Sequence, residues 1–132
     1  MTCLPYVAIA AAFALIHLPR LVVSREMKHQ PGGYDNHEPR RQQAQLEGIG
    51  RRALGAHQNG FEAFAPFAIG VIAALSRGVR PGVVDAIAFG FVAVRTGYVI
   101  AYLADKPTLR SALWALGMIA TVALYVYAIL GG

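Results

Sequence analysis

The chain has 132 residues, of which 56% are hydrophobic and only 14% are charged, and its formal net charge is +5. A mean hydropathy of +0.47 and a charged fraction well below the roughly 25% of soluble domains argue against a soluble domain and indicate a membrane protein. The basic residues form no stripe interleaved with exposed aromatic residues, which argues against nucleic-acid binding, and the single cysteine excludes a disulfide framework within the chain.

Four segments have the roughly 20 mostly apolar residues that a transmembrane helix needs. They span residues 4–23, 53–75, 83–103 and 109–130. The first has the position of a secretory signal peptide. However, no positive charge precedes it and its apolar run is too long for such a signal, so we expect a retained span. Residues 1–132 are therefore predicted to form a single membrane domain of the all-α class, a four-helix transmembrane bundle.

The connections between the spans differ in kind. Residues 24–52 are polar, rich in turn formers and carry six basic residues, so we expect an extended loop that ends in a short helix over residues 40–48. The other two connections are short. Because the positive-inside rule counts Lys and Arg, the first and third connections are expected in the cytoplasm and both termini outside it. The small size and the lack of a eukaryotic retention signal favour a bacterial inner membrane.

Polar residues nevertheless occur deep within the second span. At 100° per residue, a quarter turn of one helix face holds Arg52, Gly55, Asn59, Glu62 and Pro66. Polar residues placed at random would scatter around the helix. Because Pro66 has no N–H to donate to the carbonyl four residues earlier, we also expect a kink and a free backbone acceptor at this depth.

A second polar face is predicted in the third span, where Arg95, Tyr98 and Tyr102 follow i, i+3, i+7 spacing. Glu62 and Arg95 lie about 15 Å and about 12 Å from the cytoplasmic side on antiparallel helices. A charge in mid-bilayer costs about 2.5–3.5 kcal/mol even on the gentler insertion scales, so we expect the two to pair. One interpretation is a structural ion pair that holds the bundle. The other is a pocket open to the cytoplasm and lined by Asn59, Glu62, Arg95, Tyr98, Tyr102 and Arg110.

These residues and their order resemble the MAPEG family, the membrane-associated proteins of eicosanoid and glutathione metabolism. The resemblance covers nearly the whole chain and rests on three motifs: RALGAHQNGFEAFAPF in the second span, RTGYVIAY in the third and LRSALW at the start of the fourth. It implies a homotrimer of four-helix bundles. Glutathione would lie between the second helix of one subunit and the third and fourth helices of its neighbour.

The resemblance also implies roles for individual residues. Those expected to hold glutathione are Arg25, Arg52, Asn59, Glu62, Arg95, Tyr98 and Tyr102. Arg110 matches the arginine that stabilises the glutathione thiolate, and the adjacent Ser111 is within reach of the same sulfur. The alternative for Arg110 is an arginine that merely snorkels to the membrane interface. Gly55 departs from the pattern, because glutathione-using members often have an arginine there that grips a glutathione carboxylate.

The expected function is a glutathione-dependent transferase or peroxidase, with glutathione as cosubstrate and a lipophilic electrophile arriving from the lipid bilayer. The alternative is a non-catalytic lipid-binding or scaffold protein of the same fold, which Gly55 favours. A third hypothesis is a small proton-coupled exporter, but those carry their essential glutamate in the first span and Glu62 lies in the second. No metal site is predicted, because the histidine and carboxylate side chains of residues 24–52 match no strong zinc spacing.

Overall fold

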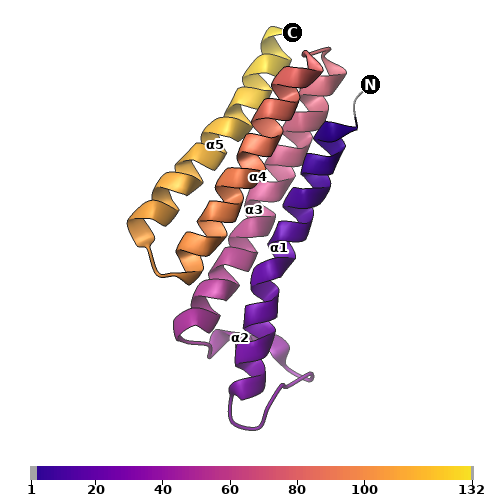
Figure 1. Cartoon of the computed structure of the whole chain (residues 1–132). Helices are drawn as coiled ribbons and strands as arrows, with labels where there is room; N and C mark the ends of the chain where they lie inside the picture. The colour runs from indigo at the N-terminus through magenta and orange to yellow at the C-terminus, as the bar shows by residue number, and fades with distance from the viewer. Residues whose placement is uncertain (1–2, 132) are drawn as a thin grey trace.

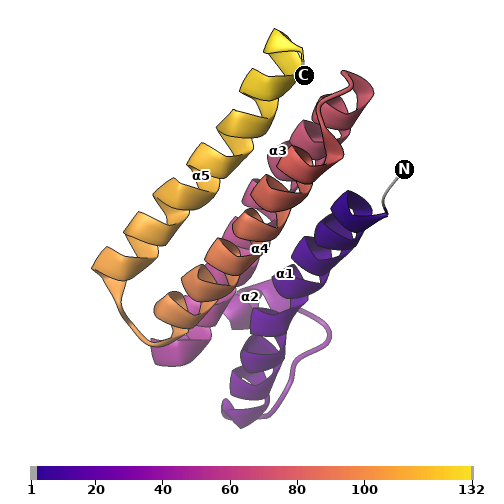
Figure 2. The same cartoon turned by 45° about the horizontal axis from the view of Figure 1, so that its top comes forward.

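The computed structural model describes residues 3–131, which form five helices and no strand. The helices are α1 (Leu4–His29), α2 (Pro39–Ala44), α3 (Gly48–Ser76), α4 (Pro81–Leu103) and α5 (Pro107–Leu130). All except α2 are long and apolar enough to cross a membrane. These four run alternately up and down side by side, so the two chain ends lie at one end of the bundle and α2 at the other (Figures 1 and 2). The predicted all-α fold with four membrane helices is confirmed.

Proline and glycine set most of the helix boundaries. Each of α1, α2, α4 and α5 has a proline at its first or second position, where the missing N–H would be unpaired in any case. α1 continues past the predicted span to His29 and stops at Gln30, which is extended because it precedes Pro31. α3 ends before Gly78, whose φ of 77° places it in the left-handed region that favours glycine.

Apolar side chains form two clusters along the bundle. In the larger one, Phe67 of α3 stacks on Phe91 of α4 with ring centroids 3.9 Å apart. The smaller one lies near α2 and contains Val23, Met27, Leu46 and Ala53. On α3, Asn59 and Glu62 fall between the residues that belong to these two clusters. The polar residues of the second span therefore occupy a layer between two dry cores.

Two arginines attach the ends of α3 to its neighbours. Arg52 Nε donates to the carbonyl of Leu103 at the end of α4, and Arg77 Nε donates to the carbonyl of Ala128 near the end of α5, each over 3.3 Å. The last carbonyls of a helix carry partial negative charge, so a cation is favourable there. The anchors hold α3 at both ends of the bundle.

The contact between α1 and α3 depends on a glycine. A Cβ added at Gly60 would lie 3.2 Å from Cγ2 of Ile16 and 3.4 Å from its backbone Cα. Gly90 of α4 provides the contrast, because a Cβ there would meet no atom within 4 Å. The absence of a side chain thus matters for packing at Gly60 and not at Gly90.

We predict that Gly60→Leu destabilises the protein by about 1–3 kcal/mol, because the added side chain overpacks the α1–α3 contact. Gly90→Leu is the matched control and is expected to be neutral or slightly stabilising, since leucine is the better helix former and this site is open. Denaturant or thermal unfolding in detergent measures both. Equal stability of the two variants would contradict the close contact.

Candidate functional site

A polar cleft of about 390 Å³ opens where α3, α4 and α5 meet. Its walls come from all three helices and consist of Gly55, Gln58, Asn59, Glu62, Tyr98, Tyr102, Arg110, Ser111 and Trp114. Most of the residues that sequence analysis singled out thus come together. They do so within one chain, whereas the resemblance implied a site shared between the second helix of one subunit and two helices of another.

Arg95 lies behind the cleft wall and is held by an amide. Its side chain is almost fully buried, with 5% of the residue exposed. Nη2 of Arg95 donates to Oδ1 of Asn59 over 2.9 Å, and Nδ2 of Asn59 donates to Oε2 of Glu62 over 3.0 Å. An amide offers both an acceptor and a donor, so it links the cation to the anion. Across residues 3–131, no direct salt bridge joins Glu62 to Arg95, in contrast to the pairing expected from sequence.

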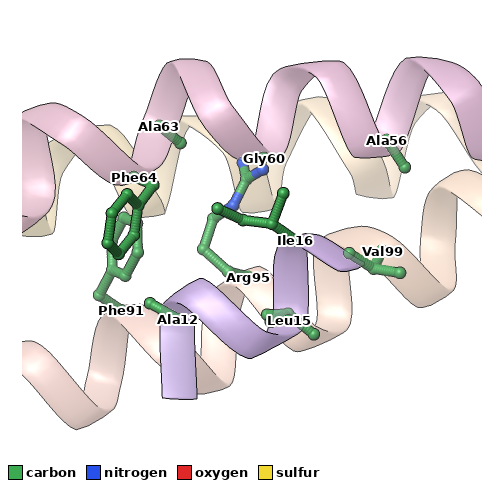
Figure 3. Close-up of a pocket in the computed structure, with 10 residues that line it drawn as sticks. All are labelled: Ala12, Leu15, Ile16, Ala56, Gly60, Ala63, Phe64, Phe91, Arg95 and Val99. Atoms are coloured by element: carbon green, nitrogen blue, oxygen red, sulfur yellow. The ribbon is translucent and has the colours of Figure 1, made fainter. Parts of the chain in front are cut away.

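The surroundings of Arg95 are mainly apolar. Figure 3 shows its side chain rising from α4 toward α3 beside Gly60, next to a cavity of only about 20 Å³ with mainly apolar walls from α1, α3 and α4. A second cavity of about 40 Å³ lies between Arg95, Glu62 and Thr121. A buried charge is costly unless it is paired and hydrogen-bonded. The hydrogen bonds through Asn59 are therefore what makes this guanidinium tolerable inside the bundle.

A stack of aromatic rings and guanidinium groups runs along the cleft. The Arg95 guanidinium carbon lies 4.0 Å from the Tyr98 ring centroid, and that of Arg110 lies 4.5 Å from the Tyr102 ring centroid. The two tyrosine rings meet edge to face, with centroids 5.6 Å apart and planes at 86°. Cation–π contacts of this length are attractive. The stack connects the buried Arg95 to Arg110, which sits at the start of α5 in the cleft wall.

Three of the residues expected to hold glutathione do not line this cleft: Arg95 stands behind its wall, and Arg52 and Arg25 lie elsewhere. Arg52 is occupied by the Leu103 carbonyl and lies 3.8 Å from the Asp105 carboxylate. Arg25 is exposed on α1 and lines no part of the cleft. Neither arginine is brought to the cleft of its own chain.

Sequence analysis missed two residues of the cleft wall, Gln58 and Trp114. Gln58 precedes Glu62 by four residues, and Trp114 follows Arg110 by four residues. Residues four apart share a helix face, so both were detectable from spacing once Glu62 and Arg110 had been chosen.

A hydrogen bond between α3 and α1 is made by His57. Nδ1 of His57 lies 2.7 Å from the carbonyl oxygen of Ile16. A carbonyl only accepts, so Nδ1 carries the proton. His17 packs beside Phe13 and His57, with ring centroids 5.0 Å and 6.0 Å away. His57 therefore ties α3 to α1 and takes no part in the cleft.

Comparison with known families decides the relationship. The family model described as MAPEG family matches residues 4–130, almost the whole chain. The chain belongs to the MAPEG family. No curated protein and no solved structure matches it at a significant level. Membership confirms the resemblance seen in the sequence. Together with the four apolar helices, it identifies an integral membrane protein of a glutathione-associated family.

In this MAPEG protein we predict that Asn59→Leu lowers the free energy of unfolding by about 1–3 kcal/mol, because Arg95 and Glu62 then lose their shared partner inside the bundle. Gln58→Leu is the control, since Gln58 makes no side-chain hydrogen bond to any of residues 3–131. Unfolding in detergent at fixed lipid content measures both variants. If Asn59→Leu is as stable as Gln58→Leu, the amide bridge contributes nothing.

Proposed function

We propose that this MAPEG protein is a glutathione-dependent transferase or peroxidase that acts on lipophilic electrophiles within the membrane. The observation that supports this most directly is the cleft, where one chain gathers a carboxylate, two amides, two phenols and a guanidinium that makes no salt bridge within residues 3–131. Glutathione carries two carboxylates, an ammonium and a thiol, so its groups match this set in charge.

The cleft residues divide naturally among these groups. Glu62 is the sole carboxylate in the wall and suits the glutathione ammonium. Arg110 suits an anion, and Asn59, Tyr98 and Tyr102 offer hydrogen bonds beside it. Arg95 acts from behind, through its hydrogen bond to Asn59 and its contact with Tyr98. We assign it the task of holding those two side chains in place.

In this proposal, residues of the cleft wall also activate the thiol of glutathione. A thiol with a pKa of about 8.5 is largely protonated at neutral pH, and a nearby cation raises the share of thiolate. Arg110 makes no salt bridge within residues 3–131, so its charge is available for the sulfur. Ser111 adjoins it in the cleft wall and supplies a hydroxyl donor.

Both proposed reactions need only glutathione and the electrophile. With an aryl halide, the thiolate sulfur forms a bond to the ring carbon while the carbon–halogen bond breaks, halide leaves with the electron pair, and the thiol proton passes to water. With a lipid hydroperoxide, two glutathione molecules give a disulfide while the peroxide becomes an alcohol and water. Holding thiolate and electrophile together supplies the rate enhancement.

The lipophilic partner has a route from the bilayer. The small cavity behind the cleft shares Glu62 and Trp114 with it and adds Pro66 and Met118 to its walls. Trp114 and Met118 are 44% and 45% exposed on α5, beside the cleft. An apolar substrate would therefore reach the sulfur between α3 and α5.

We further propose a homotrimer in a bacterial inner membrane, with both termini outside the cytoplasm. Gln58 and Glu62 are exposed on the single chain although they lie well inside the second span. A carboxylate facing hydrocarbon is expensive. Neighbouring copies that cover this face would remove the penalty, and the exposed Arg25 of one copy would then be available to the cleft of the next. Native mass spectrometry from lipid nanodiscs should show three chains, and a stable monomer would contradict this arrangement.

We predict that Arg110→Ala lowers turnover of glutathione with 1-chloro-2,4-dinitrobenzene by about 10- to 100-fold, the loss expected when a cation that lowers a thiol pKa by one to two units is removed. Lys106→Ala is the matched control. It removes a charge one turn earlier, from an exposed residue outside the cleft, and should leave turnover unchanged. The ultraviolet absorbance of the bound thiolate should fall in parallel in the Arg110 variant. Equal loss in both variants would assign the effect to general surface charge.

The alternative of a non-catalytic lipid-binding protein is favoured by Gly55, and it makes a different prediction. Equilibrium dialysis at about millimolar glutathione, in the range of ordinary enzyme KM values, should show binding that is weakened in Glu62→Gln. The amide of that variant keeps the shape of the side chain and loses the charge that attracts the ammonium. Specific lipid binding with no glutathione affinity in the natural protein would replace the enzyme proposal by this alternative.

A further inference from the structure

Tyr102 fills the space above Gly55. A Cβ added at Gly55 would overlap the Tyr102 hydroxyl and lie 2.9 Å from Cζ of its ring. The face of the same ring carries the Arg110 guanidinium, 4.5 Å from the ring centroid. One tyrosine ring thus rests its tip on the backbone of α3 and supports a cation that comes from α5.

We propose that Gly55 and Tyr102 are positioning residues that place the Arg110 guanidinium in the cleft wall, so that α5 supplies the cation for an anionic carboxylate or thiolate. This inference rests on the proposed function for the identity of the ligand, and on geometry alone for the placement of the charge. It assigns a role to Gly55, which otherwise differs from glutathione-using members only in lacking the arginine that they often have there.

The position of Arg110 shows why it needs a support. It lies four residues into α5, which begins at Pro107, and the N-terminal end of a helix carries partial positive charge that repels a cation. The first turn of α5 contains no acidic residue to offset this. Neither a salt bridge nor a side-chain hydrogen bond within residues 3–131 fixes its orientation. The ring of Tyr102 is the contact that does.

Gly55 and the stacked ring depend on one another. Any side chain at residue 55 would need the volume that Tyr102 occupies, so an arginine there and this position of the ring are mutually exclusive. The same ring also meets the Tyr98 ring edge to face, with centroids 5.6 Å apart. Glycine at residue 55 therefore leaves room for the ring that carries the Arg110 guanidinium, so the cation in the cleft wall comes from α5.

Trp114 provides a probe that needs no glutathione. It is the single tryptophan of the chain, lines the same cleft and follows Arg110 by one helical turn. Quenching of its fluorescence by iodide, an anion, relative to neutral acrylamide reports the positive charge beside it. We expect Tyr102→Met to lower this iodide-to-acrylamide ratio by about twofold, whereas Tyr102→Phe keeps the ring and the ratio.

The role of Gly55 is tested by a double-variant cycle. Gly55→Ala should lower the ratio in the natural background and have no further effect in the Tyr102→Met background, because it acts through the ring. Circular dichroism and size-exclusion chromatography confirm the fold of each variant, and Gly55→Ala carries the test alone if Tyr102→Met does not fold. An unchanged ratio in Gly55→Ala or in Tyr102→Met would overturn the proposal.

Glutathione affinity measured by equilibrium dialysis separates this inference from the proposed function. We expect about 2- to 5-fold weaker binding in Gly55→Ala and no change in Lys106→Ala, which lies outside the cleft. A lowered quenching ratio in a protein that never binds glutathione would support the positioning role and refute the proposed function. Weaker glutathione binding with an unchanged ratio would refute the positioning role and leave the function standing.

Discussion

The hydrogen bonds that run from Arg95 through Asn59 to Glu62 are the interaction on which the rest of the site depends. A guanidinium surrounded by apolar walls is stable only if nearby groups balance its charge and accept hydrogen bonds from its N–H groups. The asparagine does this from α3, and in doing so it fixes the rotation of α3 against α4. That rotation in turn presents Glu62 to the cleft and keeps Tyr98 under the guanidinium.

A small residue contributes to this arrangement. Gly60 lets α1 approach α3 beside the arginine, because a Cβ there would lie 3.2 Å from Cγ2 of Ile16. Apolar clusters above and below hold the helices, so every group in the cleft wall stands on a helix and none on a mobile connection. Functional groups on packed helices are placed more accurately than groups on loops, which suits the proposed reaction between a thiolate and a substrate from the membrane.

The sequence predicted the fold well because hydropathy and helix period decide it. Four apolar runs gave four helices, and the rise per residue placed Glu62 and Arg95 at the same level. The same reasoning did not predict individual side-chain contacts. Helical angle and depth locate a residue to about one turn, and they cannot distinguish a direct ion pair from one bridged by Asn59. Arg52 has the predicted helix face, but its long side chain turns to the Leu103 carbonyl. The sequence pattern predicted on which helix face each residue lies, but not the direction that its side chain takes.

The anchors at the two ends of α3 have a mechanical consequence. Because Arg52 holds the end of α4 and Arg77 holds the end of α5, sliding of α3 along its own axis would break a hydrogen bond at each end at once. When the bilayer is thicker or thinner than the apolar length of the helices, tilt of the bundle and deformation of the surrounding lipid leave these two hydrogen bonds intact, whereas sliding of α3 does not.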